Sequence, residues 1–140
     1  MGPLAMSTRS LHLWIGFGGV LVFLGTGVYM RLAFPELYGG NESVRYMYRA
    51  NHVYVLLGSL INLVVGVYFM DFRSGWRRTV ALGGSWLLLG APFVLLLAFF
   101  FEAPRGIPER IITGAGVFML FLGVLAQWPN RALHSGERGR

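Results

Sequence analysis

The run "TVALGGSWLLLGAPFVLLLAFFF", residues 79–101, decides which folds are open to this sequence. It holds 23 consecutive residues without Asp, Glu, Lys or Arg, between Arg78 and Glu102. A transmembrane helix needs about 20 predominantly apolar residues, because each residue adds about 1.5 Å and the hydrocarbon core is about 30 Å thick. The run therefore predicts one membrane-spanning helix.

Three further runs have the same character. Residues 10–30, 50–70 and 111–130 hold 21, 21 and 20 residues without those charges. The sequence thus predicts an all-α integral membrane protein in which one domain, residues 1–140, forms an up-and-down bundle of four transmembrane helices. The second helix is expected to extend at its outer end. The expected spans are about 10–33, 44–70, 78–101 and 108–128.

The charges predict the orientation of the chain. All twelve Lys and Arg positions are arginine, and an even number of spans places both termini on one side together with the loop 71–78. That side carries seven arginines and the other side five. Because cytoplasmic loops are enriched in basic residues, both termini are expected in the cytoplasm, at a bacterial inner membrane. The arginines bracket the spans rather than forming one patch, so no nucleic-acid partner is expected.

Polar residues follow one side of the second predicted span. At about 100° per residue they fall within one half of the helix, and Val53, Leu57, Leu60 and Val64 fall on the other half. Polar groups in hydrocarbon cost several kcal/mol each, so this half is expected to face protein or water. The candidate ligand-binding residues on it are Arg45, Tyr48, Arg49, Asn51, His52, Ser59 and Asn62.

Two interpretations of this polar half stay open. In the structural one, Arg45 and Arg49 pair with acids such as Glu42, Glu102 and Glu109, and Asn62 makes an interhelical hydrogen bond. In the other, Arg45 and Arg49 hold an anionic or carbonyl group, His52 exchanges a proton, and aromatic side chains flank the ligand. Such a site at the outer mouth of the bundle suits a phospholipid head group or a quinone.

Histidines raise the question of haem. The segment "HLWIGFGGVLVFLGTGVYM", residues 12–30, resembles the first span of small membrane cytochromes of b type, which pair an early histidine with a later glycine. The resemblance implies haem b, with His12 and either His134 or Met6 as axial ligands. His12 and His52 are predicted near opposite ends of their spans, so they are not expected to ligate one iron.

No catalytic set is found in the sequence. There is no cysteine, no H-E-x-x-H, no phosphate loop and no acid within the four uncharged runs. The segment "ESVRYMYRAN", residues 42–51, resembles the second-helix motif of the membrane-associated eicosanoid and glutathione enzymes at Arg49 and Ala50. The Asn and Glu of that motif correspond to Val53 and Leu56 here, where the pattern departs. An enzyme is therefore not expected.

The glycines and prolines within the predicted spans indicate how the helices bend and pack. Pro92, in the middle of its span, is expected to kink the helix and to free a carbonyl about one turn earlier. The glycines within the spans predict close packing between helices. Together these features predict an accessory or assembly subunit that packs against a larger membrane complex or itself. The alternatives are a lipid- or quinone-binding module, an oligomeric pore and a b-type haem protein.

Overall fold

The computed structural model describes residues 7–68, 75–106 and 110–127, and within these ranges the chain is helical without strands. The expected all-α architecture with four helices is confirmed. The helix α4 has 17 residues, whereas the other three helices are long and apolar enough to cross a membrane. The elements are α1 (Thr8–Leu37), α2 (Glu42–Val67), α3 (Trp76–Phe101), a 3₁₀ turn η1 (Ala103–Arg105) and α4 (Ile111–Gln127).

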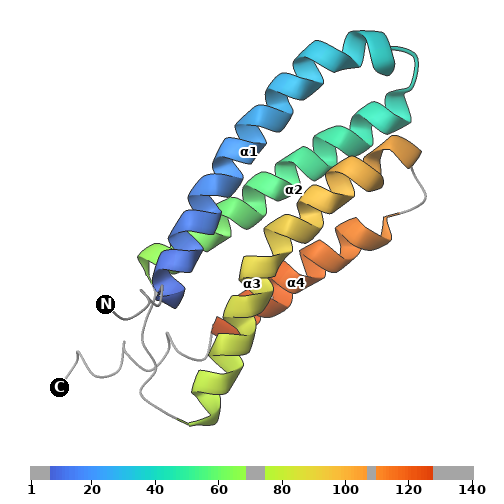
Figure 1. Cartoon of the computed structure of the whole chain (residues 1–140). Helices are drawn as coiled ribbons and strands as arrows, with labels where there is room; N and C mark the ends of the chain where they lie inside the picture. Colours follow the sequence, from blue (N-terminus) through green and yellow to red (C-terminus); the bar gives the residue numbers. More distant parts are fainter. Residues whose placement is uncertain (1–6, 69–74, 107–109, 128–140) are drawn as a thin grey trace, which may run out of the picture.

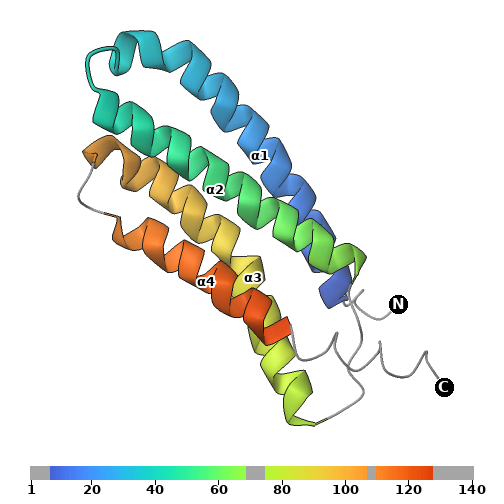
Figure 2. The ribbon, with the colours of Figure 1, turned by 180° about the vertical axis from the view of Figure 1, so that it is seen from behind.

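The helices form two antiparallel hairpins that lie side by side (Figures 1 and 2). The helix α1 packs mainly on α2, and α4 packs mainly on α3, while α2 and α3 join the hairpins. Contacts between α1 and α3 and between α2 and α4 are sparse. Both hairpins turn at the same end, here called the loop end. The start of α1 and the end of α4 lie at the other end, here called the terminal end.

Helix bounds differ from the expected spans by up to four residues, and a proline is involved at two of these places, the end of α1 and the start of α4. The helix α1 continues past Pro35 to Leu37, although proline lacks the N–H that would bond to the carbonyl of Arg31. The break is tolerated because it falls in the last turn, where the N–H of Tyr38 still bonds to the carbonyl of Phe34 at 3.1 Å. At the other place, α4 begins at Ile111, whereas the expected start at Pro108 lies outside the described residues.

Two apolar clusters hold the helices together. The first lies toward the loop end and includes Phe34, Met47, Tyr48 and Phe99. The second lies nearer the middle and consists of Val55, Val65, Leu88, Ala91, Leu95 and Leu120. The half of α2 expected to face lipid is exposed at Val53, Leu57, Leu60 and Val64. Apolar side chains therefore cover the outside as well as the core, which suits contact with acyl chains.

Glycines allow the hairpins to close, as the sequence predicted. A Cβ on Gly16 of α1 would lie 2.9 Å from the carbonyl oxygen of Ser59 and 2.8 Å from the amide nitrogen of Leu63. In the other hairpin, a Cβ on Gly84 or on Gly123 would lie 3.0 Å from the carbonyl oxygen of its counterpart. Backbone atoms cannot yield as side chains do, so these positions bring the helix backbones together.

We expect Gly16→Ala to destabilise the folded chain by about 1–3 kcal/mol, because the added methyl group forces α1 and α2 apart. The measurement is the free energy of unfolding in mixed micelles. Gly25→Ala is the matched control in the same helix, since a Cβ at Gly25 meets nothing within 4 Å. An equal loss of stability in both variants would contradict close packing at Gly16.

Candidate functional site on the polar face of the second helix

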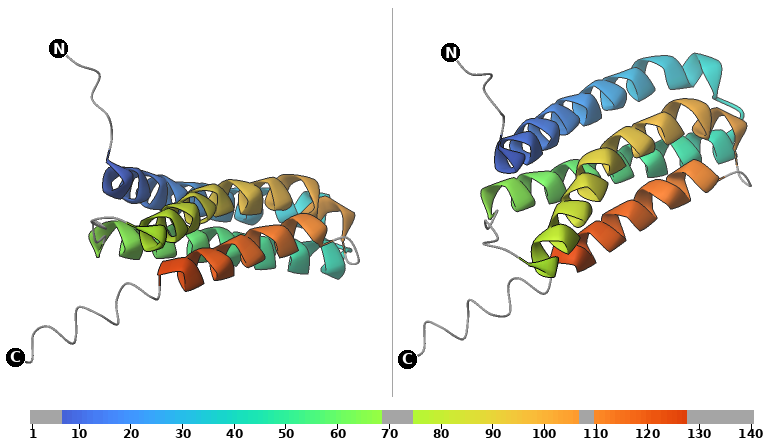
Figure 3. Two further views of the ribbon diagram at one scale, coloured as in Figure 1. Left: turned by 90° about the horizontal axis from the view of Figure 1, so that it is seen from below. Right: turned by 60° about the horizontal axis from the view of Figure 1, so that its bottom comes forward.

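Asn62 joins three helices. Its side-chain Nδ2 donates to the carbonyl of Leu88 in α3 at 2.7 Å and to the carbonyl of Gly58 in its own helix at 2.9 Å. In a regular helix the carbonyl of Leu88 would accept from the residue four positions later, which is Pro92 and has no N–H. Asn62 therefore satisfies the carbonyl that Pro92 leaves free. Figure 3 shows that α3 changes direction along its length.

His12 forms a hydrogen bond with the oxygen of the same amide group. Its Nδ1 lies 2.7 Å from Oδ1 of Asn62, and both side chains are fully buried. Because both protons of the Asn62 amide point to carbonyls, Oδ1 acts as the acceptor and Nδ1 of His12 carries a proton. A chain of hydrogen bonds thus runs from α1 through α2 to α3, and His12 is part of the packing.

Asn51 makes the corresponding link toward the loop end. It precedes Asn62 by eleven residues, which is three helical turns plus about 20°, so both asparagines share one face. Its Nδ2 donates to the carbonyl of Ala98 in α3 at 3.1 Å. Its Oδ1 lies 2.9 Å from Oγ1 of Thr113 in α4. Asn51 therefore ties α2 to both helices of the second hairpin.

Glu102 caps the start of α4. It is buried, with 3% of its surface exposed, and its two oxygens accept from the amides of Ile112 at 3.0 Å and Thr113 at 2.8 Å. The hydroxyl of Thr113 also contacts this carboxylate. These amides are the second and third of the helix, which otherwise lack partners, and the helix dipole favours a negative charge there. The oxygens of Glu102 that could have paired with Arg45 or Arg49 are thus directed to α4.

His52 lies between α1 and α2. Ten residues separate it from Glu42, which places it about 15 Å from the start of α2 and close to the midpoint. The single proton of the Thr26 hydroxyl goes to the carbonyl of Phe23 at 2.9 Å, so Nδ1 of His52 donates to Thr26 at 2.9 Å. The ring also stacks on Phe23 with centroids 4.0 Å apart. His52 thus contacts α1, and its expected part in a ligand site at the outer mouth of the bundle stays a prediction.

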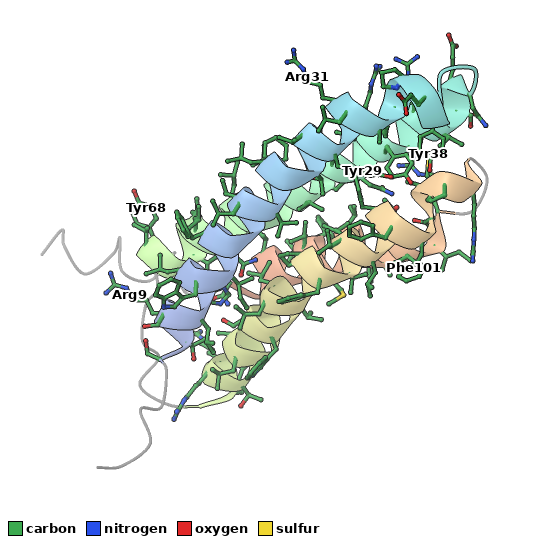
Figure 4. All side chains as sticks on the ribbon, turned by 45° about the horizontal axis from the view of Figure 1, so that its top comes forward. Arg9, Tyr29, Arg31, Tyr38, Tyr68 and Phe101 are labelled. Carbon is green, nitrogen blue, oxygen red and sulfur yellow. The ribbon has the colours of Figure 1, made fainter. Side chains whose placement is uncertain are left out.

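Tyr48 belongs to an aromatic cluster at the loop end. Its ring packs against Phe34 and Phe99 with centroids 5.1 and 5.0 Å apart, and its hydroxyl lies 3.2 Å from that of Tyr38. Tyr29 and Tyr38 lie at this end, while Arg31 extends away from the other helices (Figure 4). Edge-to-face rings of this kind hold helix ends together through dispersion and quadrupole interactions.

The seven candidate residues do not surround one space. Tyr48, Asn51, Ser59 and Asn62 are buried and bonded, the hydroxyl of Ser59 to the carbonyl of Val55 at 2.7 Å. The other three, Arg45, Arg49 and His52, retain exposed surface on one flank of α2. The Nε of Arg45 is buried without a hydrogen-bond partner among the described residues. The buried, hydrogen-bonded residues Tyr48, Asn51, Ser59 and Asn62 are here called the polar seam, and Arg45, Arg49 and His52 form a basic flank beside it. A quinone or lipid head group at that flank stays a prediction.

Haem through these histidines stays a prediction as well. His52 bonds to Thr26, which follows His12 by fourteen residues in α1. The two histidines are therefore about 21 Å apart along the axis of α1. They therefore cannot share an iron, as expected. His134 and Met6 lie outside the described residues, and within those residues no group of three metal-ligating side chains gathers.

Sequence reasoning missed several partners of the polar face. It identified Asn62 and Pro92 separately, but Leu88, Thr26 and Thr113 were not foreseen. Thr113 offered a signal, because it is a polar residue in the first turn of an otherwise apolar run. No protein-family model, curated protein or solved structure matches the chain.

Removal of the Asn62 amide is expected to destabilise the fold by about 1–3 kcal/mol, because Asn62→Ala leaves a buried carbonyl without a donor. In a Pro92→Ala background the helix itself supplies that donor, so the same substitution should cost less. A double-mutant cycle on the free energy of unfolding measures the difference. Equal costs in the two backgrounds would show that Pro92 and Asn62 are independent.

Glu102→Ala should loosen the start of α4, because the amides of Ile112 and Thr113 lose their acceptor. Hydrogen exchange at these amides is expected to accelerate, with a loss of about 1–2 kcal/mol of local stability. Glu36→Ala is the matched control, since Glu36 is exposed near the end of α1. Unchanged hydrogen exchange at the amides of Ile112 and Thr113 in Glu102→Ala would contradict the role of Glu102 as a cap of α4.

Proposed function

We propose that the chain is a multi-pass protein of the bacterial inner membrane and that it acts as a non-catalytic accessory subunit, packing α1 against a larger membrane protein. Its polar side chains support this role, because Asn51, Ser59, Asn62, Glu102 and Thr113 are bonded within the fold. Among the described residues, few polar side chains are left for chemistry on a substrate. What the chain offers to other molecules is mainly apolar surface.

The observation that carries the proposal is the one-sided attachment of α1. Of its most apolar 18-residue window, 17% is buried, against 50% in α3. The outward face of α1 is defined here as Phe17, Leu21, Leu24, Gly25, Val28 and Leu32, all of them exposed. Gly25 lies within this face, and open space at its Cβ position leaves room for the backbone of a partner helix.

The proposal includes four spans with both termini in the cytoplasm. The 17 residues of α4 extend about 25 Å, at the short end of the range that crosses a bilayer. The described arginines at the terminal end are Arg9, Arg77 and Arg78, and the sequence gives this side more arginines than the other. Those counts support the terminal end as the cytoplasmic one.

The test is native mass spectrometry of the protein extracted in mild detergent from its own membrane. We expect a larger membrane chain to be retained by the wild type and lost in Gly25→Leu, because the added side chain blocks close approach of a helix. Gly114→Leu on α4 is the matched control, since Gly114 is also exposed with open space at its Cβ position. A wild type that is monomeric and free of partners would overturn the proposal, and retention of a second copy alone would replace it with self-association.

A further inference from the structure

A groove runs between α1 and α3. It has a cavity volume of about 290 Å³, and Gly18 and Val22 of α1, Val55 of α2, and Pro92 and Phe93 of α3 contribute to its lining. The groove exists because α1 contacts α3 only sparsely while each packs fully against its own hairpin partner. Gly18 widens it, since no atom lies within 4 Å of the position that its Cβ would take.

The groove suits a slender apolar chain better than a helix or water. A single helical turn, about 10 Å wide and about 5.4 Å long, occupies on the order of 400 Å³, so this open groove would take up only part of it. Water needs two or more polar partners in a cavity, and the lining here is almost wholly apolar. What fits is a slender apolar chain, because roughly ten units the size of a water molecule, about 30 Å³ each, fill the volume.

The direction of the groove matches that of a lipid chain. Its α1 lining runs from Trp14 to Val22, about 12 Å along the helix axis. A helix that crosses a bilayer lies roughly parallel to the acyl chains, so a chain can follow this wall without bending. Trp14 is 67% exposed at the terminal-end side of the groove, and tryptophan favours the level of the lipid head groups.

The charges at the two ends favour an anionic head group at the terminal end. All described acids, Glu36, Glu42 and Glu102, lie toward the loop end. The described charges toward the terminal end are Arg9, Arg77 and Arg78, all exposed. A phosphate at the level of Trp14 would therefore meet positive charge and no described carboxylate.

We propose that this groove is a binding site for one acyl chain of an anionic phospholipid whose head group lies at the terminal end. The site rests on the proposed insertion of the chain into a membrane, but not on the proposed partner. A resident chain would fill the space between the hairpins and act as part of the core there, because the two hairpins otherwise meet mainly through α2 and α3.

The test uses native mass spectrometry of the full chain in mixed micelles with a phosphatidylglycerol of one defined chain length. We expect the wild type to retain one phospholipid and Gly18→Leu to lose it, because the leucine occupies the groove. Gly25→Leu is the control in the same helix, since its side chain adds bulk on the outward face of α1, and it should retain the lipid. Loss of the partner chain in Gly25→Leu with the lipid kept would separate this site from the proposed docking face.

Photo-crosslinking covers the case in which Gly18→Leu fails to fold. The wild type is placed in vesicles of the same lipid, a fraction of which carries a photoactivatable group on its acyl chain. Peptides containing Val22 and Phe93 should be labelled more strongly than peptides with exposed apolar residues of α4, such as Phe118. Uniform labelling of all lipid-facing helices, retention of lipid by a folded Gly18→Leu, or retention of a different apolar molecule by the wild type would overturn the proposal.

Discussion

The carbonyl of Leu88 is the group on which the arrangement of the first three helices depends. Pro92 takes away its normal donor, and in hydrocarbon an unpaired carbonyl costs several kcal/mol. Asn62 supplies the donor from α2 at 2.7 Å, and His12 supplies one proton from α1 to the oxygen of the same amide. One missing N–H in α3 thus accounts for buried polar residues in two other helices.

The second asparagine, Asn51, also donates to a carbonyl of α3, but that carbonyl, of Ala98, keeps its helical bond from the N–H of Glu102 at 3.0 Å. The two asparagines together fix the register of α2 against α3. Asn51 donates to the carbonyl of Ala98, and Asn62 donates to the carbonyl of Leu88. The later asparagine of α2 thus bonds to the earlier residue of α3, because the two helices are antiparallel. Through Thr113 and Glu102 the same seam reaches the start of α4. The polar groups that hold the four helices together in this way are hydrogen-bonded within the fold, whereas Arg45, Arg49 and His52 retain exposed surface beside the apolar outer faces.

Sequence periodicity predicted much of this, because its physical causes are local. Runs without charge indicated the helices, the 100° spacing indicated the inward half of α2, and Pro92 indicated a freed carbonyl. The pairing of Asn62 with Leu88 was not predictable, since it depends on the register and crossing of two helices. Glu102 was considered as a partner for arginine on charge alone. In the structure α4 lies beyond the turn at Ala103–Arg105, and its first amides donate to Glu102, a contact that depends on the path of the chain.

Solid-state NMR on the protein in lipid bilayers tests the central claim most directly. Asparagine labelled with ¹⁵N in its side chain and leucine labelled with ¹³C at its carbonyl report the distance between Nδ2 of Asn62 and the carbonyl of Leu88. The hydrogen bond, 2.7 Å from Nδ2 to the carbonyl oxygen, predicts a measurable dipolar coupling between the two labels that disappears in Asn62→Ala. A wild-type spectrum without that coupling would contradict the seam and the arrangement of helices that depends on it.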